Sequence, residues 1–251
     1  MKKIHVLFFL VFLAANINTA SAQKELTEGN ITLSITDIKS DDPQTQTMMQ
    51  MMKSSTINVQ FNSIQSLLTM DMMNGMMKTR TLIQNNDKTS LTLMDMMGQK
   101  MMTKISAEEV AKAEKEAKEK ATTKDEKIDY DITYDKSVTK KIMGYDCYKA
   151  NIIIKNKEAK DLKISLFVTK KLKLPKALTQ QMDDKVSDFK LKEFPLEATI
   201  EVNDKNGKSF SVTVAATKFE TSVDKNVFNL DTEGYKEMTP EEMKKMGGMG
   251  F

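Results

Sequence analysis

Apolar and polar residues alternate with a period of two along much of this chain. The clearest runs are 128–134, 148–154, 162–168 and 210–216. Such alternation is typical of β-strands with one buried face and one solvated face. Further strands are predicted at 30–38, 56–61, 65–73, 76–84, 90–97 and 196–203. The pattern therefore predicts roughly ten strands in a mainly β (α+β) fold, built as a curved antiparallel sheet or incomplete barrel.

The dipeptide Asn74-Gly75 predicts a hairpin, because both residues readily adopt the positive φ angles of a type I′ turn. This turn would place Met72 opposite Met77 and Asp71 opposite Lys78. Gly98-Gln99 is expected to form a second two-residue turn, of type II′.

Each hairpin would then have two different faces, because successive side chains of a strand point to opposite sides of the sheet. One face should form the wall of a ligand cavity, carried by Leu68, Met70, Met72, Met77, Met94, Met96 and Met101. The opposite face should be in contact with water and would carry Thr69, Asp71, Lys78 and Arg80.

Three helices are predicted between and after the strands. Residues 106–121 are rich in Glu and Lys and begin with a capping box, Ser106 with Glu109, which indicates a solvated helical insertion. Residues 176–189 carry an apolar stripe that includes Leu178 and Met182 and should close the mouth of the sheet over the cavity. A short third helix is expected from Thr239 through 246, followed by a flexible tail at 247–251.

The N-terminus has the three parts of a secretory signal peptide. Lys2 and Lys3 precede an apolar run at 4–15, and the small residues at 20–22 fit signal peptidase. Cleavage is expected after Ala22, which leaves a single domain over 23–246 in the periplasm or outside the cell. No other segment has the roughly 20 apolar residues that a transmembrane helix needs.

The composition argues against several kinds of catalytic site, metal site and partner. The only histidine, His5, lies in the signal, so the exported chain has no imidazole for a catalytic triad or a His-ligated zinc site. The 38 basic and 35 acidic side chains nearly balance, and Arg80 is the only arginine, which argues against a nucleic-acid partner. Adjacent acids at 41–42 and 183–184 are interpreted as solvated. We therefore expect that this protein is not an enzyme and that it binds no cofactor.

Cys147 is the only cysteine, so no intramolecular disulfide can form. It lies between tyrosines at the start of a predicted strand and is interpreted as a small buried residue.

Methionine is concentrated in one part of the chain. Fourteen of the 21 methionines lie between Met48 and Met102. Thioethers fill irregular apolar space, which fits a packed core or a cavity lining. They are also soft ligands that select Cu(I), and this alternative is assigned to Met48, Met49, Met51 and Met52.

The C-terminal half resembles a known family. The matching segments are 141–147, Phe-Val-Thr-Lys at 167–170, Phe-Pro-Leu-Glu at 194–197, 216–218, 223–224 with Phe228, and Gly-Tyr-Lys at 234–236. In order and spacing they are similar to family 4412 of the domains of unknown function, from secreted Bacteroidota proteins. At Glu193 this chain departs from the glycine that is common in the family. The resemblance implies the fold of the lipoprotein carriers LolA and LolB, with helices over an apolar cavity, and brings no catalytic residues.

These observations support one main hypothesis and two alternatives. The main hypothesis is an exported, non-enzymatic protein that binds or carries an acyl chain, a lipoprotein-like ligand or another hydrophobic small molecule. The alternatives are a methionine-rich Cu(I)-binding protein and a structural protein that contacts another component of the cell envelope.

Overall fold

The computed structural model describes residues 24–112, 130–154, 162–173, 191, 193–203, 209–239 and 242. The expected signal peptide, the helix at 176–189 with Leu178 and Met182, and the tail at 247–251 lie outside these residues. Among the described residues, no helix is both long enough and apolar enough to cross a bilayer.

The described chain is mainly β and is dominated by one sheet of twelve strands. In spatial order this sheet consists of β14 (Lys236–Glu237), β7 (Gln99–Ile105), β6 (Ser90–Met96), β5 (Met77–Gln84), β4 (Gln65–Met72), β3 (Thr56–Phe61), β2 (Gly29–Ser40), β13 (Ser209–Glu220), β12 (Phe194–Asn203), β10 (Leu162–Thr169), β9 (Tyr145–Ile154) and β8 (Tyr130–Ile142). Every pairing is antiparallel except that of β14 with β7, which is parallel. The predicted strands are confirmed with ends shifted by a few residues, except that β8 extends eight residues beyond the predicted end at 134.

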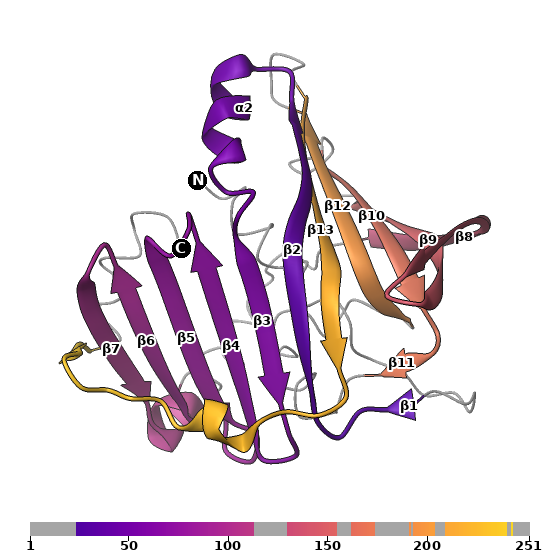
Figure 1. The fold of residues 1–251 in the computed structure, drawn as a ribbon. Helices are drawn as coiled ribbons and strands as arrows, with labels where there is room; N and C mark the ends of the chain where they lie inside the picture. Colours follow the sequence, from indigo (N-terminus) through magenta and orange to yellow (C-terminus); the bar gives the residue numbers. More distant parts are fainter. Residues whose placement is uncertain are drawn as a thin grey trace.

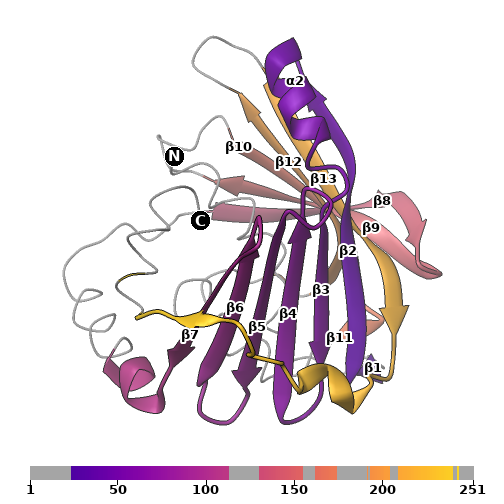
Figure 2. The same cartoon turned by 60° about the vertical axis from the view of Figure 1, so that its left-hand side comes forward.

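The sheet bends about the neighbouring strands β2 and β13 (Figure 1). One arm consists of β3 to β7 and the other of β12, β10, β9 and β8, and both arms bend toward the same side (Figure 2). The pairing of β2 with β13 has register shifts at Thr213/Val214 and Ala216/Lys218, and such bulges bend a sheet. The first and last strands of the order, β14 and β8, do not pair, so the expected curved and unclosed sheet is confirmed.

Apolar side chains form a core inside the second arm. Residues from β9, β10 and β12 pack with Leu191, and the cluster consists of Ala150, Ile152, Ile164, Leu166, Val168, Leu191 and Ile200. A second cluster joins both arms to a small parallel sheet of β1 (Lys24–Glu25) and β11 (Leu172–Lys173). Its largest fully buried side chain is that of Phe61. The second cluster therefore holds the two arms together where the sheet bends.

The first predicted hairpin is confirmed in its register. Met72 lies opposite Met77 and Asp71 opposite Lys78. Asn74 and Gly75 have φ angles of 56° and 83°, as a type I′ turn requires. Met73 also has a positive φ, of 54°, so the loop includes one more residue on each side than expected.

The second predicted turn is wrong in position and type. The central residues are Met97 and Gly98, with φ angles of 53° and 85°, and Met96 pairs with Gln99. This is a type I′ geometry, in place of the type II′ turn expected at Gly98-Gln99. The Asp95 carboxylate accepts a hydrogen bond from the Gly98 amide at 3.0 Å, which favours the observed turn. Met94, Met96 and Met101 remain on one face, because the pairing shifts by two residues.

Helix α2 (Pro43–Gln50) was not among the predicted helices. Its N-cap is Asp42, whose carboxylate accepts hydrogen bonds from the backbone and hydroxyl of Thr45, and proline occupies the first turn. The predicted capping box at Ser106 is present, and Thr239 forms a second one with Glu242. Glu109 accepts from the amide and hydroxyl of Ser106, and Glu242 accepts in the same way from Thr239. Residues 107–112 are helical, and 113–121 lie outside the described part.

The segment 221–238, here named the C-terminal strap, crosses the ends of β3 to β7 (Figures 1 and 2). It contains the 3-10 helix η2 (Lys225–Phe228) and ends in β14, which pairs with the edge strand β7. Phe228 is buried against Leu67 and Leu82. The strap was not predicted, and it covers part of the face that was expected to be in contact with water.

Candidate functional site

The first arm brings the predicted cavity wall together on one face of the sheet. We name this the inner face, and within β4 to β7 it carries Ser66, Leu68, Met70, Met72, Met77, Thr79, Thr81, Ile83, Ser90, Thr92, Met94, Met96, Gln99, Met101, Thr103 and Ile105. None of these residues is charged. The wall residues predicted from the sequence within the described chain all lie on this face.

The wall residues lie in rows that cross neighbouring strands. One row runs Met72, Met77, Met96, and the next runs Met70, Thr79, Met94, Met101. Directly opposed side chains on adjacent strands have Cβ atoms roughly 5 Å apart and make contact. Met70 continues the second row to Ile57 of β3 and Leu33 of β2. Thr79 separates Met70 from Met94 in this row, and the other members are apolar, so a largely apolar row leads toward the bend of the sheet.

This apolar surface is only partly covered. Leu68, Met70, Met72, Met77, Met94 and Met96 are half-buried, whereas Met101 is buried. Soluble proteins seldom leave a contiguous apolar patch accessible unless it contacts a ligand or a partner. The methionine rows thus have the accessibility of a binding surface, in contrast to the buried cluster of the second arm.

A row of hydroxyl groups lies beside the methionines on the inner face. Thr81, Thr92 and Thr103 are opposed on β5, β6 and β7. The hydroxyls of Thr81 and Thr92 are 3.2 Å apart and share a hydrogen bond. Thr103 is buried, and its Oγ1 has no hydrogen-bond partner among the described residues. A buried hydroxyl without a partner is costly, so this atom is suited to a polar group of a ligand.

The outer face of the same strands is charged. Asp71, Lys78, Asp95 and Lys100 lie opposite one another on successive strands, which gives a row of alternating sign. Lys78 is exposed, as predicted. The prediction for Arg80 needs a correction. Its side chain is half-buried, and Nη2 donates a hydrogen bond to the Tyr235 hydroxyl at 3.3 Å, because the C-terminal strap covers this part of the sheet.

The methionines of the copper alternative lie at helix α2 and the turn after it. Met49 packs against the cluster of Ile38, Val212 and Val214, and the Met51 side chain is 55% exposed. Met52 is half-buried. Nothing is described of the Met48 side chain. The assignment of a Cu(I) site to these four methionines stays a prediction.

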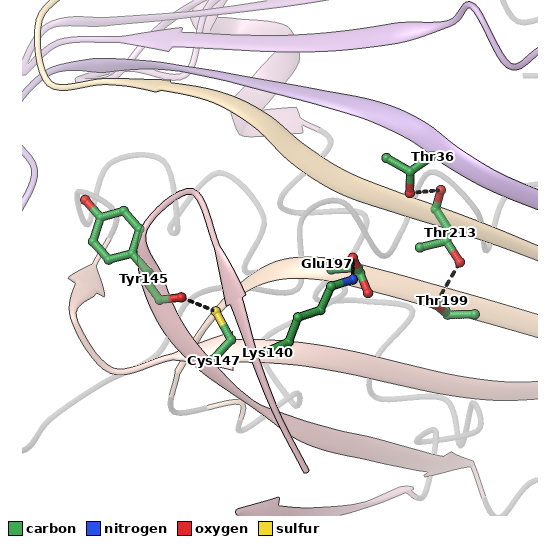
Figure 3. A network of polar contacts seen from close by, with 7 residues as sticks. All are labelled: Thr36, Lys140, Tyr145, Cys147, Glu197, Thr199 and Thr213. Carbon is green, nitrogen blue, oxygen red and sulfur yellow. Dashed lines mark hydrogen bonds and ion pairs between the residues drawn. The ribbon is translucent and has the colours of Figure 1, made fainter.

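Cys147 is buried, which confirms the interpretation of a small core residue. Its Sγ donates to the Tyr145 carbonyl at 3.5 Å, as Figure 3 shows beside the ion pair of Lys140 with Glu197. Burial raises the pKa of the Cys147 thiol to about 11. The thiol is therefore protonated at neutral pH and is a poor nucleophile.

Glu193, where the chain departs from the family pattern, is buried beside the second arm. Its Oε1 accepts a hydrogen bond from the Tyr148 hydroxyl at 2.6 Å. Burial and this bond raise the pKa of Tyr148, so the phenol stays protonated. The pair holds the start of β12 against β9.

The acidic pair Asp41-Asp42 has structural roles. Asp42 caps helix α2, and Asp41 accepts hydrogen bonds from the backbone and hydroxyl of Ser209 at 2.9 and 2.7 Å. These bonds lower the pKa of Asp41 and tie the end of β2 to the start of β13. Asp183 and Asp184 lie outside the described residues.

A pocket of about 670 Å³ lies away from the methionine rows, at the other end of β5 to β7. It is lined by the two capping boxes and by residues that include Leu82, Leu91, Lys104, Glu237 and Met238. None of the predicted wall residues on β4 to β7 lines it. Its carboxylates and the Lys104–Glu237 ion pair make it a poor site for an acyl chain.

Two features of the site were missed from the sequence. The first is the threonine row, whose members lie on the inner face. With the correct pairing of β6 with β7, the sequence would have placed Thr92 opposite Thr103. The second is the C-terminal strap, for which the sequence contains a clearer indication. Leu67, Leu82 and Leu93 occupy outer-face positions and are buried, and three leucines on a face expected to be wet indicate a cover.

Comparison with known proteins gives only distant similarity. No family model matches the chain, so the resemblance to family 4412 is not confirmed, and no curated protein matches it. Among solved structures, the chain is similar to a DUF1329 family protein from Desulfovibrio piger, with 9% identity, a TM-score of 0.26, and coverage of 84% of this chain and 90% of the other.

Two further structures are similar at the same level. One is a putative outer membrane lipoprotein-sorting protein domain from Vibrio parahaemolyticus, with 10% identity, a TM-score of 0.18, and coverage of 83% and 92%. The other is a LolA superfamily protein from Nitrosomonas europaea, with 9% identity, a TM-score of 0.18, and coverage of 86% and 92%. TM-scores this low are not sufficient to assign a function, which has to be inferred from the residues of this chain.

Proposed function

We propose that this protein is an exported, non-enzymatic binding or carrier protein for an amphiphile with an acyl chain. One observation carries the proposal: the inner face of β4 to β7 has no charged residue and presents half-buried methionines in two adjacent rows. An apolar chain lying on these rows would remove the surface from water. Each CH₂ group buried stabilises the complex by about 0.8 kcal/mol.

The polar end of the ligand is expected at the threonine row. Thr103 has a buried Oγ1 without a partner among the described residues, and Thr92 lies opposite it. A carboxyl, hydroxyl or ester oxygen could form a hydrogen bond there while the chain extends over Met94 and Met70. Methionine suits this role because its unbranched side chain adapts to ligands of different shape.

Export supports the same function. The N-terminal 22 residues have the pattern of a cleavable signal, so the protein would meet its ligand in the periplasm or outside the cell. An envelope protein that delivers or receives the ligand would be its natural partner.

The test is binding of a fluorescent fatty acid to the exported protein and to a matched pair of variants. Met70→Asp places a charge on the inner face, whereas Thr69→Asp places one on the outer face opposite Arg80. Binding should be lost in the first variant and retained in the second. A third variant, Thr103→Val, removes the hydroxyl with little change of shape and should weaken binding about fivefold, the equivalent of one hydrogen bond of about 1 kcal/mol. Absence of binding by the unmodified protein would refute the proposal.

A further inference from the structure

Three methionine side chains lie in one row at the hairpin end of the first arm. Met72 of β4 is opposite Met77 of β5, and Met77 is opposite Met96 of β6. All three belong to the inner face and are half-buried. Adjacent strands are about 4.8 Å apart, so three neighbouring thioethers can reach a common point without movement of the backbone.

The backbone holds the ends of these strands together. The Met97 amide of the second hairpin donates a hydrogen bond to the Met76 carbonyl of the first at 2.8 Å. Met76 precedes Met77 and Met97 follows Met96, so this bond fixes the two strand ends that carry two of the three thioethers. Met76 and Met97 are themselves exposed, by 44% and 77%.

The chemistry of the row is that of a soft-metal site. Thioethers are neutral soft ligands that select Cu(I), and they bind the hard ions Mg²⁺ and Ca²⁺ poorly. The neighbouring inner-face residues, Met70, Thr79 and Met94, carry no competing charge. Among the described residues, no group of three His, Cys, Asp or Glu side chains could hold a metal ion. A site in this part of the protein would therefore rely on methionine.

We propose that Met72, Met77 and Met96 form a three-coordinate site for one Cu(I) ion. This assignment goes beyond the acyl-binding function and differs from the sequence-based assignment to α2. The α2 region places Met49 against the sheet and leaves Met51 exposed, whereas the row presents three thioethers on one face at adjacent strands.

The test uses the purified mature chain, Cu(I) kept reduced by ascorbate without oxygen, and a chromophoric Cu(I) chelator as competitor. Ag(I) serves as a redox-inert probe in parallel. We compare the triple variant Met72→Leu, Met77→Leu, Met96→Leu with a control in which Met48, Met49, Met51 and Met52 are replaced by Leu. Leucine nearly conserves volume and removes the sulfur, so both variants should fold, which thermal melts would check.

The expected result is that the unmodified protein and the α2 control retain one Cu(I) ion against the competitor, while the row variant loses it. The single variant Met77→Leu should also lose the ion, and Met76→Leu should keep it. X-ray absorption at the copper edge should show only sulfur neighbours. Retention of Cu(I) by the row variant, loss in the α2 control, or absence of Cu(I) binding by the unmodified protein would each overturn the assignment.

Binding of the fluorescent fatty acid separates this inference from the proposed function. The unmodified protein is titrated with each ligand separately, so the outcome for Cu(I) does not depend on the outcome for the fatty acid. Binding of Cu(I) without binding of the fatty acid would refute the proposed function and leave the metal site in place. A protein that binds the fatty acid and never binds Cu(I) would refute the metal site alone.

Discussion

Arg80 donates a hydrogen bond to the hydroxyl of Tyr235, at 3.3 Å and across 155 residues of chain. Lys100 places its ammonium group 5.5 Å from the centre of the same ring. Together with Phe228, these contacts hold the C-terminal strap on the outer face of the first arm, opposite the proposed ligand surface.

We predict that Phe228→Ala destabilises the protein by about 3 to 5 kcal/mol, because the phenyl ring is buried against Leu67 and Leu82. Tyr235→Phe removes only the hydrogen bond to Arg80 and should cost about 1 kcal/mol or less. Urea unfolding of both variants measures the difference. Equal effects would show that the strap is not held by its apolar anchor.

Substitutions at Met72 and Asp71 test the face assignment within the first hairpin. Met72→Asp places a carboxylate on the inner face without a partner and should cost more than about 2 kcal/mol or abolish fatty-acid binding. Asp71→Asn weakens only the interaction with the opposed Lys78 and should cost about 1 kcal/mol or less. Thermal melts and fatty-acid binding of the two variants decide this, and equal tolerance would contradict the assignment of Met72 to an apolar inner face.

The alternation of apolar and polar residues predicted the strands and the first hairpin because these depend on short-range patterns. The residues at 56–61 alternate cleanly, and β3 has those bounds in the structure. Asn74-Gly75 likewise determines which residues of β4 and β5 are opposed. The apolar wall followed directly from these two features.

Helix α2, the second turn and the C-terminal strap depend on side-chain contacts that the alternation of apolar and polar residues does not reveal. Helix α2 has no regular apolar stripe, and its start depends on the Asp42 cap, which was interpreted as a solvated acid. The turn at Met97-Gly98 puts a methionine at positive φ, and the Asp95 side chain stabilises it from outside the turn. The strap binds strands more than a hundred residues away, so only the outward leucines pointed to it.

The Asp41 contact predicts a dependence of stability on pH. Hydrogen bonds from Ser209 lower the pKa of Asp41 from its ordinary value of 3.8. A carboxyl group with a lower pKa in the folded state stabilises the protein above the unfolded pKa, and this contribution is lost as pH falls through the folded pKa. Asp41→Asn should therefore lower the Tm at pH 7, and its effect should shrink as the pH falls from the ordinary pKa of 3.8 through the lower pKa of the folded state. A difference in Tm that is independent of pH would contradict the ionic role.

Cys147 should be unreactive in the native protein. Its thiol is buried, and its pKa is raised to about 11, so very little thiolate is present at pH 8. Iodoacetamide at pH 8 should modify Cys147 only after denaturation in guanidinium, as intact mass would show. Rapid modification of the folded protein would mean that this part of β9 opens.

The location of the bound acyl chain tests the central claim most directly. A fatty acid with a photoreactive diazirine near the end of its chain can be crosslinked to the exported protein and the labelled peptides identified by mass spectrometry. The account predicts labels on the inner-face residues of β4 to β7, around Met70, Met94 and Met101, and competition by unlabelled fatty acid. Labels confined to the pocket around Leu82, Leu91 and Met238, or labelling that unlabelled fatty acid does not reduce, would contradict it.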